Sequence, residues 1–126
     1  MDITKKQNEI EKTEYQDMAI LDVQTYNFGD ELSIFVENSE EKCWEISFQS
    51  CYKVSYETDA NWRGIDNVRD MRGGQLGYYG QDITLHEYNE DDAFIQCKVD
   101  LSIMTLNIVC KNIFVREILL SEKSFL

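Results

Sequence analysis

The sequence predicts an all-β protein, either an antiparallel β-sandwich or a flattened barrel of about eight strands. Three observations predict this class. From residue 15 onward, apolar residues tend to alternate with polar ones, which is the period of a half-buried strand. Turn-forming residues separate the apolar runs at short intervals. The apolar spacing of a helix does not recur between the strands, which argues against an alternating α/β fold.

Length and composition predict one domain. The chain has 126 residues, of which 43% are hydrophobic and 12% aromatic, enough to fill a single core. Residues 1–14 are polar and are expected to form a solvated N-terminal lead-in, with a short helical turn around Ile3 and Ile10. The β domain is expected to comprise residues 15–126.

The first half of the chain predicts its strands in this order. Residues 19–28 are rich in Ile, Leu, Val, Tyr and Phe, and a Gly-Asp turn follows them. Leu32, Ile34 and Val36 then alternate with Ser33, Phe35 and Glu37. Residues 38–41, which are Asn, Ser and two Glu, then predict a hairpin turn.

The clearest period of two lies in residues 44–56. One parity of this run is mostly apolar and comprises Trp44, Ile46, Phe48, Tyr52, Val54 and Tyr56. The run is longer than a typical strand. We therefore expect a bend or bulge near Ser50 that divides it into two strands or carries it between two sheets.

The strand pattern resumes at residues 83–88, and the acidic residues 90–92 predict a turn after it. Residues 95–103 alternate again, and residues 105–110 and 113–120 predict two further strands.

A long loop is predicted at residues 58–82, where the alternation stops. It holds five of the six glycines and three of the four arginines. Loops of this length in compact domains tend to be functional. The loop is rich in the residue types that dominate binding hot spots. Those residues are Trp62, Arg63, Arg69, Arg72, Tyr78 and Tyr79. The alternative is a structural role, in which the arginines pair with acids at the base of the loop.

Charge is the strongest compositional signal. The chain has 24 Asp and Glu against 12 Lys and Arg, a formal net charge of -12. Such a surface repels nucleic acids and anionic membranes and favours a basic protein partner. The acids expected to meet that partner lie at predicted turns and are Glu40, Glu41, Glu90, Asp91 and Asp92. The alternative is that the acids serve solubility and protect sheet edges.

The sequence lacks a complete catalytic motif, so we expect no enzymatic activity and no cofactor or metal. His86 is the single histidine and is expected at a half-exposed strand position. The four cysteines have no CxxC spacing and are expected to be buried free thiols. The segment from Asp59 to Gly64 resembles the start of a calcium loop, but Arg63 stands where a ligand is needed.

The N-terminus lacks the apolar run of a secretory signal, and no stretch approaches the ~20 apolar residues that span a bilayer. A cytoplasmic location is therefore expected.

In its small size, acidity and predicted all-β fold, the chain resembles the immunity proteins of bacterial toxin systems. More narrowly, residues 31–36 (ELSIFV) followed by residues 43–48 (CWEISF) are similar to the two-strand opening of several such families. The resemblance implies a protein that binds and neutralises a cognate toxin, often a basic nuclease. No binding residue is carried over, because no diagnostic motif matches.

The leading hypothesis is therefore a non-enzymatic protein-binding module, an immunity-type inhibitor of a basic toxin. One alternative is a β-sandwich that binds a small molecule, a sugar or calcium at residues 59–82. A third hypothesis is a hydrolase that uses carboxylates such as Asp66, Asp70 and Asp82.

Overall fold

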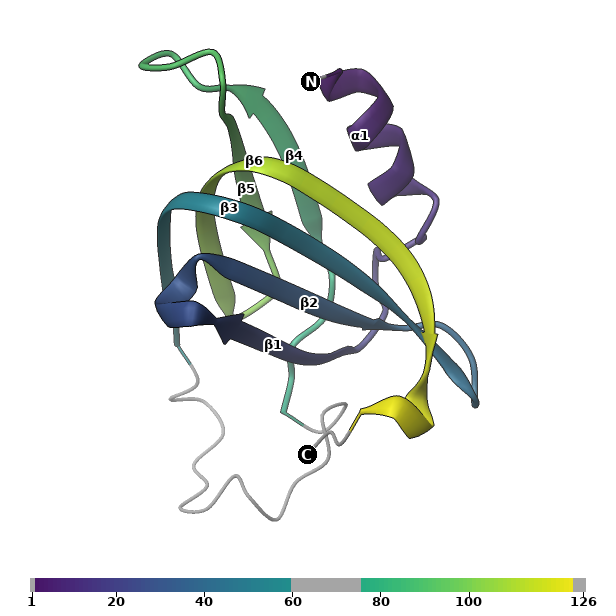
Figure 1. Cartoon of the computed structure of the whole chain (residues 1–126). Coiled ribbons are helices and arrows are strands. Elements are labelled where there is room, and N and C mark those ends of the chain that lie inside the picture. Colours follow the sequence, from purple (N-terminus) through teal and green to yellow (C-terminus); the bar gives the residue numbers. More distant parts are fainter. Residues whose placement is uncertain (1, 60–75, 124–126) are drawn as a thin grey trace.

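The computed structural model describes residues 2–59 and 76–123 (Figure 1). They form one α-helix, six β-strands and two short 3-10 turns. In chain order these are α1 (Ile3–Glu11), β1 (Ile20–Tyr26), η1 (Asn27–Gly29), β2 (Glu31–Glu37), β3 (Lys42–Thr58), β4 (Asp82–Glu87), β5 (Ile95–Asp100), β6 (Met104–Leu119) and η5 (Leu120–Glu122). The predicted all-β class is confirmed.

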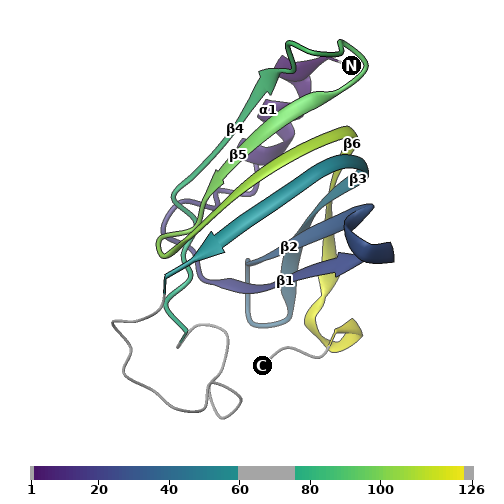
Figure 2. The ribbon, with the colours of Figure 1, turned by 90° about the vertical axis from the view of Figure 1, so that its left-hand side faces the viewer.

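The strands form a single antiparallel sheet in the order β1-β2-β3-β6-β5-β4. The two central strands, β3 and β6, are long and curve strongly, so that the β1–β2 hairpin lies across from the β4–β5 hairpin (Figure 2). The main core fills the space between these halves. It combines buried residues of β2, such as Leu32 and Ile34, with Ile83 of β4 and Val99 of β5. One sheet folded in this way is sandwich-like.

The two outer strands come together at one corner of the fold. Ala19 forms an isolated antiparallel bridge with Tyr79, and the Ile20 amide donates to the Tyr78 carbonyl at 2.8 Å. The Gly80 amide donates to the Met18 carbonyl at 2.9 Å. A Cβ on Gly80 would lie only 2.2 Å from the Tyr15 carbonyl oxygen, so this close approach requires glycine. The fold is therefore a flattened barrel that is joined at this corner.

The helical turn expected around Ile3 and Ile10 is present as the helix α1, and this helix is docked on the sheet rather than solvated. Ile3, Gln7 and Ile10 share one face of α1 through their spacing of four and three residues. Ile10 is fully buried. The Gln7 side chain donates to the Ile83 carbonyl and accepts from the Leu85 amide, both at 2.8 Å. These bonds satisfy the outer edge of β4. No helix within residues 2–59 and 76–123 is long and apolar enough to cross a bilayer.

The expected irregularity near Ser50 is present, but it does not divide the strand. Ser50 has a positive φ of 54°, and the β3–β6 register shifts between Cys51 and Lys53. The pairing then continues to Thr58. Residues 105–110 and 113–120 likewise lie in one continuous strand, β6. The described residues therefore form six strands where about eight were expected. The prediction divided two long strands, whose bends are absorbed within a single ladder.

Replacement of Gln7 tests the docking of α1. Gln7→Ala removes two hydrogen bonds to the edge of β4 and should lower the free energy of unfolding by about 1–2 kcal/mol. Asn8→Ala, at the next, exposed position of the helix, is the control and should be neutral or slightly stabilising. Urea denaturation measures both. Equal effects of the two substitutions would contradict the proposed role of Gln7.

Candidate functional site

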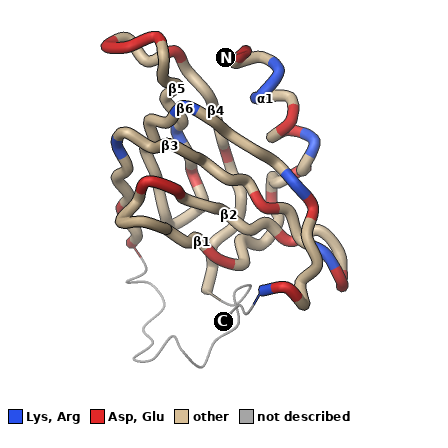
Figure 3. The backbone as a smooth tube through the Cα atoms, viewed as in Figure 1, with Lys and Arg blue, Asp and Glu red and all other residues tan. Residues whose placement is uncertain are grey.

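The β4–β5 turn presents Glu90, Asp91 and Asp92 to solvent, at the top of the molecule as seen in Figure 3. Hydrogen bonds within the turn fix its shape. The Tyr88 hydroxyl donates to the Glu90 carboxylate, and the Asp91 carboxylate accepts from the Ala93 amide at 2.9 Å. Of the predicted partner-binding acids, these three therefore lie together on one ordered turn.

Three aromatic rings gather beside this turn. The centroid of Tyr52 on β3 lies 5.1 Å from that of Phe94 and 6.4 Å from that of Tyr88. Tyr88 and Phe94 are 6.5 Å apart and nearly perpendicular. We call these three residues the aromatic patch. Tyr52 is 59% exposed. Sequence reasoning missed the patch, because parity placed Tyr52 with the core residues of β3.

The bulge explains why parity misplaced Tyr52. The β3–β6 register passes from Cys51 paired with Cys110 directly to Lys53 paired with Val109, so Tyr52 is the extra residue of the bulge. The available signal was the irregularity expected near Ser50, since a bulge re-aims the side chains next to it.

Two lysines lie against the aromatic patch. The Lys53 ammonium is 5.7 Å from the Tyr52 ring centroid and 3.9 Å from the Glu90 carboxylate. The Lys111 ammonium is 5.4 Å from the Phe94 centroid. A hydrogen bond with Tyr88, together with the nearby Glu90 charge, raises the pKa of Lys53. The hydrogen bond to Glu90 raises the pKa of Tyr88. The surroundings of the patch therefore favour cations.

Glu40 and Glu41 lie elsewhere, on the exposed β2–β3 turn. The Ser39 hydroxyl accepts from the Lys42 amide at 3.2 Å, and the Glu41 carbonyl accepts from the Leu120 amide at 2.8 Å. In Figure 1 this turn and the β4–β5 turn are at opposite ends of the fold. The structure therefore does not bring the two predicted acidic turns into one surface.

Tyr78 and Tyr79 lie at the corner where the sheet edges meet. Tyr78 is half-buried, packs against the main core, and shares a 2.7 Å hydrogen bond with Thr58. Tyr79 is 40% exposed and forms the bridge with Ala19. Their backbone roles are structural, and the Tyr79 side chain remains accessible.

Several predicted residues lie outside the described part of the chain. They are Trp62, Arg63, Asp66, Arg69, Asp70 and Arg72. The proposed ligand-binding loop at 59–82 therefore stays a prediction for residues 60–75, as does the carboxylate-based hydrolase. Asp82, the third carboxylate of the hydrolase hypothesis, is exposed at the start of β4.

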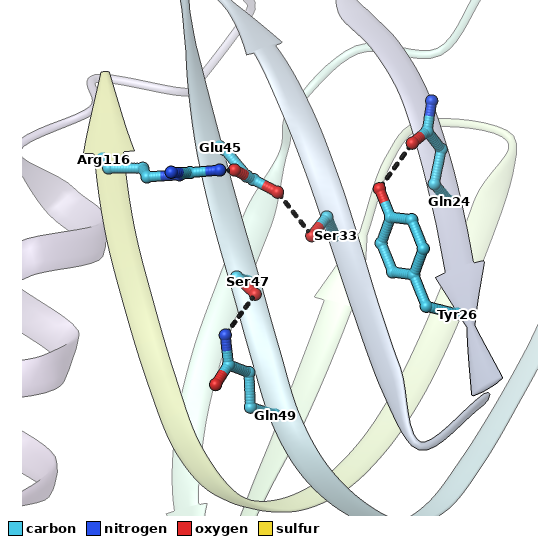
Figure 4. Close-up of polar contacts among 7 residues, drawn as sticks. All are labelled: Gln24, Tyr26, Ser33, Glu45, Ser47, Gln49 and Arg116. Atoms are coloured by element: carbon cyan, nitrogen blue, oxygen red, sulfur yellow. Dashed lines mark hydrogen bonds and ion pairs between the residues drawn. The ribbon is translucent and has the colours of Figure 1, made fainter. Parts of the chain in front are cut away.

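A second polar site lies on the outer face of β2, β3 and β6 (Figure 4). Glu45 is only 5% exposed and accepts from the Ser33 hydroxyl at 2.8 Å and from Arg116 Nε at 2.7 Å. The same face holds a Tyr26–Gln24 hydrogen bond and a Gln49–Ser47 hydrogen bond. Ser33 and Arg116 stabilise the buried Glu45 carboxylate by their hydrogen bonds. Because the three residues lie on β2, β6 and β3, these bonds also help to fix the register of the three strands.

The four cysteines are free thiols, and the single histidine is exposed. Cys43, Cys97 and Cys110 are buried and free, as predicted, and Cys51 is half-buried. Burial raises the pKa of Cys51 to about 11 and that of Cys110 to about 12, so these thiols are poor nucleophiles. His86 is exposed and shares a 3.1 Å hydrogen bond with Thr84. Within the described residues, no three His, Cys, Asp or Glu side chains gather as a metal site would need.

Comparison with known families bears on the class of the protein. The family model described as "Immunity protein PIM7" matches residues 2–117. The chain belongs to the PIM7 immunity-protein family. The resemblance drawn from its sequence is thereby confirmed at the level of the protein class.

Other comparisons place the fold of this PIM7 family member. The crystal structure of an uncharacterized protein from Neisseria gonorrhoeae is similar, with a TM-score of 0.54 and 12% sequence identity. The similarity covers 81% of this chain and 92% of that one. At this identity it shows a shared fold alone. A search of curated proteins finds no match to the chain.

The Glu45–Arg116 pair makes a testable contribution to the stability of this PIM7 family member. Arg116→Met leaves the buried Glu45 carboxylate without its cation and should lower the free energy of unfolding by about 2 kcal/mol. This value is modest because Arg116 is 66% exposed. Glu45→Gln combined with Arg116→Met removes the buried charge as well, and should cost less than Arg116→Met alone. Urea denaturation at pH 7 measures both variants; a double variant that loses as much stability as Arg116→Met, or more, would contradict the pairing.

The buried thiols predict a loss of stability at high pH. The pKa of Cys110 rises from its ordinary 9.0 to about 12 in the folded state. Below pH 9 the thiol is protonated in both states, and its contribution to stability is fully present. As pH rises from 9 toward 12, only the unfolded chain releases the proton, so the free energy of unfolding falls. Cys110→Ala should therefore show a shallower decline than the wild type in urea denaturation over this range. Parallel declines would contradict the assignment.

Proposed function

We propose that this chain is an immunity protein that binds a cognate toxin and neutralises it by occlusion. Membership of the PIM7 immunity-protein family is the observation that carries the proposal. The chain would act by binding alone and would carry out no reaction of its own. The proposal includes a cytoplasmic location, where a toxin entering or made in the cell would meet it.

The proposed partner is basic. The formal net charge of -12 on 126 residues would attract a positively charged protein over a distance comparable to the screening length. Both acidic turns are exposed (Figure 3). Such charges chiefly raise the association rate, while packed apolar contacts slow dissociation.

The architecture also supports a binding role. Every strand of the single sheet is hydrogen-bonded to a neighbour, and α1 and the 16–20 segment pack against the β4 side of the sheet. A surface held in this way loses little conformational entropy on binding. The ordered hydrogen bonds of the β4–β5 turn extend this rigidity to its exposed acids.

Co-expression with a toxin tests the proposal. The probe is a basic toxin domain sought among the genes that neighbour this one, produced in a sensitive host with and without this chain. Survival should depend on co-expression, and a catalytically inactive form of the toxin domain should bind the purified chain. Because charge steers the association, the rate constant should fall by about tenfold or more between 50 and 500 mM salt.

The control is an unrelated acidic protein of similar net charge, which should neither protect the host nor bind with comparable affinity. Death of the host despite soluble, folded chain, together with no binding, would sink the proposal. Protection without salt dependence would retain the immunity function and reject the basic partner.

A further inference from the structure

The aromatic patch of Tyr52, Tyr88 and Phe94 has no part in the core. None of the three belongs to either cluster of buried core residues or packs against one as a partly buried hydrophobic residue. Their rings contact one another at centroid distances of 5.1–6.5 Å. Tyr52 is 59% exposed. A cluster of touching rings that the core does not need resembles the anchor of a protein interface.

The local structure holds these rings in place. The bulge positions Tyr52, and the turn between β4 and β5 supplies the other two rings. The Tyr88 hydroxyl is bonded to Glu90, which ties one ring directly to the acidic residues. The rings and acids thus form one pre-arranged surface rather than two independent features.

The chain's own lysines show which chemical groups this surface attracts. Lys53 and Lys111 place ammonium groups 5.7 and 5.4 Å from the centroids of Tyr52 and Phe94. Lys53 also reaches Glu90 at 3.9 Å. These side chains stand where the cations of a partner would be held, by ring faces and a carboxylate together. The Lys53 and Glu90 side chains are 60% and 72% exposed, so their ion pair is weak and easily exchanged.

We propose that the aromatic patch and the acidic turn of Glu90, Asp91 and Asp92 form the docking surface for an Arg- or Lys-bearing segment of the cognate toxin. The inference rests on the proposed function and adds the location and chemistry of the contact. A partner cation lies between a ring face and a carboxylate, and exchanges with Lys53 or Lys111. The rings then supply the desolvated contact area, and Asp91 and Asp92 supply the attraction.

Charge selects this occupant over a second copy of the chain. Two copies, each with a formal net charge of -12, would bring their acidic turns into repulsion if this face were shared. The β2–β3 turn also carries acids. However, no pair of contacting rings among the described residues lies at that turn. The β4–β5 turn is the place where acid and exposed aromatic area coincide.

Two tyrosines on the same strand give a matched test. Tyr52 and Tyr56 are 59% and 60% exposed, and only Tyr52 belongs to the aromatic patch. Tyr52→Ala should weaken binding of the inactive toxin domain by about 30-fold or more, the loss typical of a hot spot. Tyr56→Ala should change affinity by less than about threefold. Tyr52→Phe keeps the ring and should retain binding.

Charge reversal gives a second matched pair. Asp92→Lys should slow association by about tenfold at low salt, whereas Glu57→Lys, with the same change in net charge on β3, should have a much smaller effect. Thermal denaturation verifies that all the variants fold. Equal effects of Tyr52→Ala and Tyr56→Ala, or of the two charge reversals, would overturn the docking surface while leaving the immunity function intact.

A hexa-arginine peptide tests the same chemistry without the toxin. In an NMR titration, the ring protons of Tyr52, Tyr88 and Phe94 should shift in a saturable way, and those of Tyr56 should not. Equal shifts at Tyr56, or none at Tyr52, would overturn the inference. A wild-type chain that binds the peptide at the patch but never binds or neutralises the toxin domain would instead refute the proposed function.

Discussion

The pairing of β3 with β6 is the constraint on which the rest of the fold depends. The ladder runs from Lys42 to Thr58 on one strand, and each of the other pairs of strands is attached to one side of it. A flat ladder of this length could not enclose a core, because its two ends would diverge. The positive φ of Ser50 and the register shift that follows it coincide with the bend of the ladder. Folding one sheet over itself is what lets Leu32 and Val99 belong to the same buried cluster.

The same bend has a second effect on the exposed surface. An extra residue in one strand cannot be paired, and its side chain is free to leave the alternation of its neighbours. Tyr52 is that residue. Its ring contacts the ring of Phe94, which is remote from it in sequence. The irregularity that shapes the core therefore also assembles the aromatic patch. Straightening β3 would therefore remove both features.

Local pattern was enough to predict the strand class, the acidic turn at residues 90–92 and the buried thiols. Each depends on the alternation or composition of a short run. Continuity of β3 and β6 was not predictable in this way, because a bulge costs little within a ladder that is paired on both sides. The docking of α1 was missed since it depends on one side chain, Gln7, that meets backbone groups 76 and 78 residues away. The aromatic patch was missed for a similar reason. Tyr52 is distant in sequence from Tyr88 and Phe94, and only the register of the paired strands brings them together.

The contact between Gln7 and β4 also bears on how the protein behaves when concentrated. An open sheet polymerises only if both of its edges accept a new strand, for then each added copy offers a fresh end. Here the outward backbone groups of Ile83 and Leu85 are bonded to the side chains of Gln7 and Tyr15. These bonds leave fewer backbone groups on the β4 edge for a strand of another copy. Gln7 and Tyr15 thus act as a guard on the β4 edge against strand addition by a second copy.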